Sequence, residues 1–325
     1  MTLARTALAL GSIVALAGGV TATAAPRING AGASFPAPIY QRWFADLARK
    51  GGPQVNYQSV GSGSGRRQFI AGTVNFGASD DPMKSADMAK VKRGVVQIPM
   101  VGGTIAIAYN KPGCNLRLTQ KQVADIFLGK ISDWKSLGCG SGKITVVHRS
   151  DGSGTTKAFS QSLSAFSPEW KSKVGTGKSL KWPVGVGGKG NEGVAGVIKS
   201  KPGSLGYVNQ AFVKGVIKAA AVQNKAGKYV KPSFTSGAAA LNNVKLDSNL
   251  AGSDPNPAGA GSYPIATLTW VLAYKTGNGD KAKTIRETLN YMLSPAAQDL
   301  ADNLGYVPLK GSILAKAKAA VNQIK

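Results

Sequence analysis

The chain has 325 residues, about twice the length of an ordinary domain, so it can form two domains or one large one. Apolar residues make up 43% and charged residues 17%, a balance that excludes a disordered chain. It carries 40 Lys and Arg against 15 Asp and Glu, a formal net charge of +25, with one His and two Cys. So few His and Cys side chains count against zinc modules and most metalloenzymes, and we expect neither a metal nor another cofactor.

The first 24 residues have the composition of a secretory signal peptide. Arg5 supplies a positive charge, residues 7–20 are apolar, and Ala22 and Ala24 form an A-x-A pattern. A membrane anchor is the alternative, but the stretch is short and broken by glycines where a span needs about 20 apolar residues. We therefore expect cleavage after Ala24 and export of a soluble, monomeric protein.

The only two cysteines are Cys114 and Cys139. Paired thiols persist as disulfides outside the cytosol, so in an exported protein we expect these two to be joined. On the chain-entropy model the closed loop contributes about 3 kcal/mol to stability. Two buried free thiols are the alternative.

Helix-like and strand-like patterns alternate along the chain, which favours an α/β architecture. Apolar residues at 40, 43, 44 and 47 are spaced for an amphipathic helix that ends before Gly51. Next come an alternating strand containing Val55 and Tyr57, the glycine-serine run 61–65, and a helix that is expected to begin near Arg66.

Thr119 and Gln122 form a T-x-x-Q capping box, which predicts a helix start. The remaining predicted elements are a strand over 144–147, a helix whose apolar residues lie at 159, 163 and 166, a surface crossing over 249–263, and a strand over 265–274.

Three segments place small residues just before a predicted helix: 30–35, 61–65 and 151–155. Glycines in such segments let successive backbone N–H groups converge, and a helix N-terminus adds partial positive charge, so together they can hold an anion. Each one alone is more often a simple helix cap. Three in one chain, one of them preceded by Arg149, favour an oxyanion site.

Other functional motifs fail on their context. Residues 185–190 match GxGxxG, but no apolar strand precedes them and no acidic residue follows at the required spacing. Residues 175–179 end like a P-loop but lack its first glycine. A serine-hydrolase triad would depend on His148, the only histidine, which we expect to be a partly buried structural side chain.

Seven stretches of the chain resemble the PstS family, the phosphate-binding proteins of bacterial phosphate ABC importers. They are GAGASFPAPIYQRW (30–43), VNYQSVGSGSG (55–65), TVNFGASDDPM (73–83), FLGKISDW (127–134), RSDGSGTT (149–156), KWPVGVGGKGNEGV (181–194) and GSLGYV (203–208). The resemblance implies a type II periplasmic-binding-protein fold, with two α/β lobes joined by two crossover strands and a ligand cleft between them. Lobe I would comprise residues 26–110 plus 262–325, and lobe II residues 111–261.

Matched motif by motif, the resemblance also implies a set of phosphate ligands. They are Ser34, Phe35, Ser62, Asp80, Arg149, Ser153, Gly154 and Thr155. Asp151 lies in the same motif and is expected to pair with Arg149. The family often has threonine where Ser34 stands, which keeps the hydroxyl. It often has a second serine where Gly63 stands, so Ser64 is an alternative to Ser62 as the donor.

These side chains have the chemistry that selects phosphate. Hydroxyls, backbone N–H groups and Arg149 donate, as any tetrahedral oxyanion requires, whereas the carboxylate of Asp80 accepts. Near neutral pH phosphate carries at least one proton that it can donate to Asp80. Sulfate carries none, so a buried carboxylate would repel it. The alternative for Asp80 is a carboxylate that caps a loop and never contacts ligand.

The excess of positive charge is also compatible with a different function, the binding of a polyanion. Residues 171–231 contain twelve Lys and one acidic residue, so this part of the chain is strongly basic and could bind a polyanion such as nucleic acid. However, these lysines are spread singly and aromatic residues make up only 7%. The basic surface either attracts small anions or merely aids solubility. A secreted phosphatase is a further alternative.

We therefore expect a non-enzymatic, periplasmic receptor that captures inorganic phosphate and delivers it to the permease subunits of an ABC transporter in the inner membrane, with no nucleic-acid partner.

Overall fold

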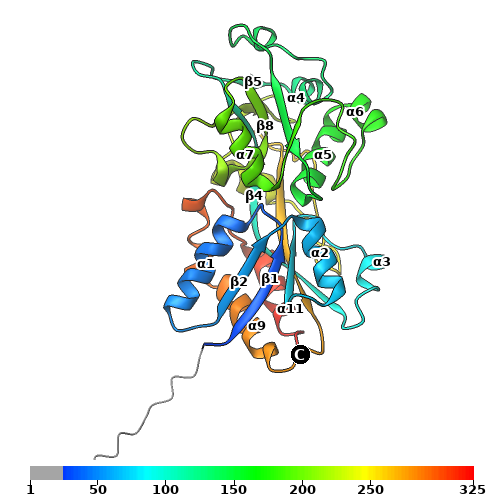
Figure 1. The fold of residues 1–325 in the computed structure, drawn as a ribbon, viewed down its shortest axis with the longest axis vertical. Helices are drawn as coiled ribbons and strands as arrows, with labels where there is room; N and C mark the ends of the chain where they lie inside the picture. Colours follow the sequence, from blue (N-terminus) through cyan, green and yellow to red (C-terminus); the bar gives the residue numbers. More distant parts are fainter. Residues whose placement is uncertain (1–24) are drawn as a thin grey trace, which may run out of the picture.

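The computed structural model describes residues 25–325, which form two α/β lobes stacked end to end (Figure 1). The expected signal peptide lies outside the described residues. Each lobe is built on its own part of a mixed sheet, with helices packed against it. Within residues 25–325 no helix has the length and apolar character needed to cross a bilayer.

The first lobe contains the two ends of the described chain. Its sheet has the strand order β2-β1-β3-β12-β4, in which β1, β2 and β3 are parallel and β12 is antiparallel to both neighbours. Its elements are β1 (Arg27–Gly32), α1 (Ala37–Arg49), β2 (Gln54–Ser59), α2 (Ser62–Ala71), β3 (Phe76–Ser79), α3 (Ser85–Met88), β4 (Val95–Asn110), β12 (Ala266–Tyr274), α9 (Lys281–Met292), α10 (Pro295–Gln298), η3 (Asp302–Leu304) and α11 (Gly311–Val321).

Most of the chain between β4 and β12 forms the second lobe. Its main sheet continues from β4 in the order β4-β8-β6-β7, with β6 parallel to β7 and β8, and a small sheet has the order β11-β10-β5. The elements are β5 (Arg117–Leu118), α4 (Gln120–Phe127), η1 (Trp134–Leu137), β6 (Thr145–Arg149), α5 (Gly154–Phe166), α6 (Pro168–Lys173), β7 (Val186–Gly188), α7 (Gly190–Ser200), β8 (Ser204–Asn209), η2 (Gln210–Phe212), β9 (Lys218–Ala219), β10 (Ala221–Gln223) and β11 (Tyr229–Val230). The helix that follows them in the chain, α8 (Phe234–Leu241), packs against β4 and β12.

Strand β4 crosses from one lobe to the other (Figure 1). It pairs with β12 as far as Thr104 and with β8 from Ile105 onward. The return segment runs beside it, where the N–H of Ile105 donates to the carbonyl of Ile265 over 2.8 Å. The hydrophobic core is continuous along this crossing and includes Ile105 and Ile107, both fully buried.

Several predicted elements are confirmed. The amphipathic helix is α1, the alternating strand is β2, and the last predicted strand is β12. Thr119 and Gln122 form the complete capping box of α4. Cys114 and Cys139 form the expected disulfide, with their Cα atoms 5.2 Å apart.

Two predicted boundaries are wrong. The strand predicted over 144–147 is β6, which extends to Arg149. The helix predicted near Arg66 begins four residues earlier, at Ser62, so most of the glycine-serine run is helical. Glycine is needed inside that helix because the backbone packs too closely for a side chain: a Cβ on Gly65 would lie 2.3 Å from the Cα of Gly32. Tertiary packing therefore overrides low helix propensity here.

Candidate functional site

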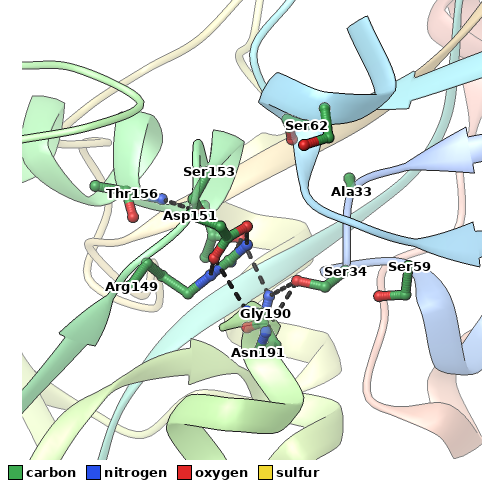
Figure 2. A network of polar contacts seen from close by, with 12 residues as sticks. Ala33, Ser34, Ser59, Ser62, Arg149, Asp151, Ser153, Thr156, Gly190 and Asn191 are labelled. Carbon is green, nitrogen blue, oxygen red and sulfur yellow. Dashed lines mark hydrogen bonds and ion pairs between the residues drawn. The ribbon is translucent and has the colours of Figure 1, made fainter. Parts of the chain in front are cut away.

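Parallel strands from both lobes end at the interface between the lobes, so the residues that follow them meet there. In open α/β sheets, the carboxyl ends of parallel strands are where ligands bind. Ser34 follows β1, Ser62 follows β2, Asp80 follows β3, residues 151–155 follow β6, and Gly190 and Asn191 follow β7. Figure 2 shows Ser34 and Ser62 of the first lobe facing Arg149, Asp151 and Asn191 of the second.

Asp80 is a buried carboxyl group held by a hydroxyl on each oxygen. Its Oδ1 accepts from Thr269 Oγ1 over 2.8 Å, and its Oδ2 accepts from Thr155 Oγ1 over 3.0 Å. Its backbone N–H donates to Ser62 Oγ over 3.3 Å. Burial raises the pKa of Asp80 to about 6, against the opposing effect of hydrogen bonds from Thr269 and Thr155 and of the charge on Arg149. At neutral pH Asp80 is therefore mainly an acceptor.

Arg149 and Asp151 form a two-point ion pair from the second lobe. Arg149 Nε lies 2.7 Å from Asp151 Oδ1, and Nη2 lies 2.6 Å from Oδ2. Burial alone would raise the pKa of Asp151, but the hydrogen bonds and charge of Arg149, with the N–H of Gly190, hold it below its usual value. The pair fixes the plane of the guanidinium and keeps the buried charge compensated. This is the pairing that the sequence predicted.

Asn191 sets the direction of the hydrogen bonds at the interface. Its backbone N–H and its Nδ2 both donate to Ser34 Oγ, over 2.9 and 3.0 Å (Figure 2). Its Nδ2 also donates to Thr155 Oγ1 over 3.2 Å. Because Ser34 Oγ accepts two bonds, its own proton is left to point away from Asn191. Asn191 thus turns the Ser34 hydroxyl into a donor available to a ligand.

The N-terminus of α5 lies against the first lobe. Ser153 caps this helix, its Oγ accepting from the N–H of Thr156 over 3.0 Å. A Cβ on Gly154 would lie 2.6 Å from Ser62 Oγ and 2.7 Å from the backbone nitrogen of Asp80, so only glycine allows this approach. The helix therefore directs its first N–H groups and partial positive charge at the interface.

The structure brings together most of the residues predicted for the site. The side chains of Ser34, Ser62, Asp80, Arg149 and Thr155 are all buried at the interface. That of Phe35 instead packs in the core, edge-on to Tyr306, so only its backbone is placed to reach a ligand.

Ser62 rather than Ser64 lies beside Asp80. Ser64 instead accepts a hydrogen bond from Arg67. His148 is half-buried and stacks on Trp182, with ring centroids 4.8 Å apart.

Sequence reasoning missed three contributors: Gly190, Asn191 and Thr269. The first two lie in the stretch 185–190 and directly after it, which was set aside as a false dinucleotide motif. The short strand β7 and the start of α7 make it a fourth strand-to-helix turn of the same design as the other three. Thr269 lies in the middle of a buried strand, where only its polarity among apolar neighbours could have drawn attention to it.

Direct contacts join the lobes around this network. The N–H of Gly63 donates to the carbonyl of Gly152 over 2.7 Å, and Lys178 Nζ lies 3.2 Å from Asp81 Oδ2. Within residues 25–325 no group of three or more His, Cys, Asp and Glu side chains could hold a metal ion. The arrangement is therefore a buried interlobe site with many hydrogen-bond donors, one guanidinium, and one acidic acceptor, Asp80, that forms no ion pair among the described residues. Such a site suits an oxyanion that bears a proton.

Two α/β lobes joined by β4 and a return segment, with the candidate site at their interface, define a two-lobed solute-binding protein. A family model described as a PBP superfamily domain matches residues 19–296. Two solved structures support the predicted type II fold. One is a periplasmic phosphate-binding protein bound with phosphate, at 22% identity and TM-score 0.77, with 90% of this chain and 93% of that one covered. The other is a phosphate-binding protein from Stenotrophomonas maltophilia, at 23% identity and TM-score 0.75, with coverage of 91% and 94%.

Curated relatives are closer in sequence. The phosphate-binding protein PstS of Haemophilus influenzae is 42% identical over 310 residues, which cover 90% of this chain and 91% of the relative. That of Methanocaldococcus jannaschii is 35% identical, with coverage of 92% and 86%. The chain belongs to the PstS family of phosphate-binding proteins. This membership agrees with the expectation of a binding protein rather than an enzyme.

Proposed function

We propose that this protein binds inorganic phosphate between its lobes and delivers it to the permease of an ABC transporter. The observation that supports this most is Asp80, a buried acceptor surrounded by donors from both lobes, in a chain of the PstS family. A fully deprotonated oxyanion would meet the charge of Asp80 without a proton to share. Hydrogenphosphate and dihydrogenphosphate each carry a proton for it.

Each residue has a defined part in this proposal. The hydroxyls of Ser34, Ser62 and Ser153 and the backbone N–H groups of Phe35 and Gly154 donate to phosphate oxygens. The Thr155 hydroxyl donates its single proton to Asp80 in this structure, so to act as a phosphate donor it would have to turn from Asp80 to the ligand. Arg149 supplies positive charge while Asp151 holds it in place. Asp80 accepts the proton that phosphate carries.

Phosphate would favour the closed arrangement because it contacts both lobes. A ligand shifts such an equilibrium only by the difference in its affinity for the two forms. Lobe I, residues 26–110 plus 262–325, would rotate relative to lobe II, residues 111–261, about the crossing strands. The closed form would then dock on permease subunits in the inner membrane.

We also infer that the protein works in the periplasm, after removal of residues 1–24. The support is the composition of that segment, together with a disulfide that suits an oxidising compartment. Intact mass of the protein isolated from its host tests this, since cleavage after Ala24 predicts a mature chain that begins at Ala25. A mature protein that retained this segment would contradict it.

Calorimetric titration with phosphate tests the proposed ligand. Loss of a charge-assisted hydrogen bond costs about 1.5–3 kcal/mol, so Arg149→Ala should weaken binding at least about tenfold. Arg117→Ala is the matched control, because Arg117 is exposed and stacks on Tyr229 in the second lobe. Equal affinity in wild type and Arg149→Ala, or no binding by wild type, would contradict the proposal.

A further inference from the structure

Thr269 lies next to Asp80 because of the way β12 fits between β3 and β4. Antiparallel pairing sets Trp270 opposite Ser79, the residue before Asp80. On the other side of β12 the register shifts between Thr269 and Trp270, because β4 carries one extra residue, Met100, at this point. β-Bulges of this kind are frequent beside functional sites, where they redirect side chains.

The Thr269 hydroxyl makes its short contact with the carboxyl group. Its Oγ1 lies 2.8 Å from Asp80 Oδ1 and 3.5 Å from the carbonyl oxygen of Ser79, so its single proton belongs to Asp80. The side chain is fully buried in a strand whose other members are mostly apolar. A buried hydroxyl at such a position needs an acceptor, and the carboxyl group of Asp80 supplies it.

We propose that Thr269 is a positioning residue for proton recognition: its hydroxyl donates to Oδ1 of Asp80 from the first-lobe side and keeps this carboxyl an acceptor, so that the site requires a ligand that carries a proton. The inference rests on the proposed function, in which Asp80 accepts the phosphate proton. Thr269 itself acts through Asp80.

Of the ionisable groups in this part of the site, Asp80 is the one that titrates near neutral pH. Burial raises the pKa values of Tyr40 on α1, Tyr57 on β2 and Tyr306 well above 10, so all three stay neutral. Arg149 on β6 faces Asp80 with a positive charge. Asp81 faces it with a negative charge that is itself paired with two cations, the side chains of Arg66 and Lys178.

The consequence of losing the Thr269 hydroxyl follows from this setting. Burial already raises the pKa of Asp80 to about 6, and the bond from Thr269 opposes that rise. Without the bond, the carboxyl group would protonate at higher pH. A protonated Asp80 can donate a hydrogen bond to a sulfate oxygen, so the site would bind sulfate instead of repelling it.

Thr269→Val, which keeps the shape and removes the hydroxyl, tests the inference, with Thr269→Ser as the rescue. The measurement is sulfate competition against phosphate across pH 5 to 8.5. For Thr269→Val the pH below which sulfate begins to compete should rise by about one unit, the equivalent of one hydrogen bond to a charged group. Thr269→Ser should follow the wild type.

Thr288→Val is the control for a merely structural effect. The Thr288 side chain is also fully buried, and its hydroxyl donates to a carbonyl oxygen in α9 over 2.9 Å. Thr288→Val should lower Tm without changing the pH below which sulfate begins to compete with phosphate. If Thr269→Val is folded and keeps the wild-type profile, Thr269 has no part in selectivity. If wild type fails to bind phosphate, or Asp80→Asn keeps wild-type selectivity, the proposed function fails instead.

Discussion

Replacing Asp80 with asparagine should stabilise the unliganded protein at neutral pH. Burial raises the pKa of this carboxyl group from 3.8 to about 6, so the folded protein disfavours its ionised form relative to the unfolded chain. A difference of about two pKa units, at about 1.4 kcal/mol each, amounts to about 3 kcal/mol. This is an upper bound for the gain, because asparagine adds two amide donors that must find acceptors among Thr155, Thr269 and their neighbours.

The gain should depend on pH with a definite sign. Between about pH 4 and pH 6 the folded wild type binds a proton that the unfolded chain has lost, so its free energy of unfolding falls as pH rises. Asp80→Asn lacks this group. The variant's advantage should therefore be near zero below about pH 4, grow through pH 6, and stay constant above about pH 7.

Urea unfolding of both proteins without phosphate, from pH 4 to pH 8, measures this difference. Asp280→Asn is the matched control, since Asp280 is exposed and its side chain caps no helix N–H. A stability difference between the two proteins that did not change with pH would contradict this expectation, as would a wild type that gained stability relative to Asp80→Asn as pH rose. Either result would mean that Asp80 is not strained by burial.

Three other changes have expected outcomes. Gly154→Ala should weaken phosphate binding, because the added Cβ would lie 2.6 Å from Ser62 Oγ and hold the lobes apart; unchanged affinity by calorimetry would contradict this. Removing the disulfide with Cys114→Ala and Cys139→Ala should lower the free energy of unfolding by about 2–4 kcal/mol and leave phosphate affinity unchanged, which urea unfolding and titration check together. Asn191→Ala should weaken phosphate binding about tenfold by freeing the Ser34 hydroxyl to rotate, whereas a wild-type affinity would show that this orientation is unimportant.

The sequence predicted the local parts of the fold well. The capping box of Thr119 and Gln122 and the spacing of apolar residues in α1 depend on neighbours in the chain, so they are visible without the structure. The start of α2 at Ser62 was not, because glycine and serine favour loops when taken alone. Contacts with Gly32 and Gly152, distant in sequence, require small residues inside that helix.

The candidate site likewise contains residues that could be predicted from the sequence and residues that could not. Ser34 lies in a recognisable small-residue turn, and Asp80 lies in a stretch that resembles the PstS family, so both could be found from motifs. Asn191 and Thr269 could not, because their importance comes from which hydroxyl or carboxyl they contact across the fold. A hydrogen-bond direction depends on three-dimensional neighbours, and no pattern of residue types along the chain encodes it.

Titration of the wild-type protein with phosphate at pH 7.5, in the presence and absence of a large excess of sulfate, is the direct test of whether Asp80 selects a ligand that carries a proton. Phosphate carries a proton for Asp80 at this pH and sulfate does not. We expect phosphate to bind tightly and sulfate to leave its affinity unchanged. Sulfate that displaced phosphate at comparable concentration would show that the buried carboxylate does not select for a proton.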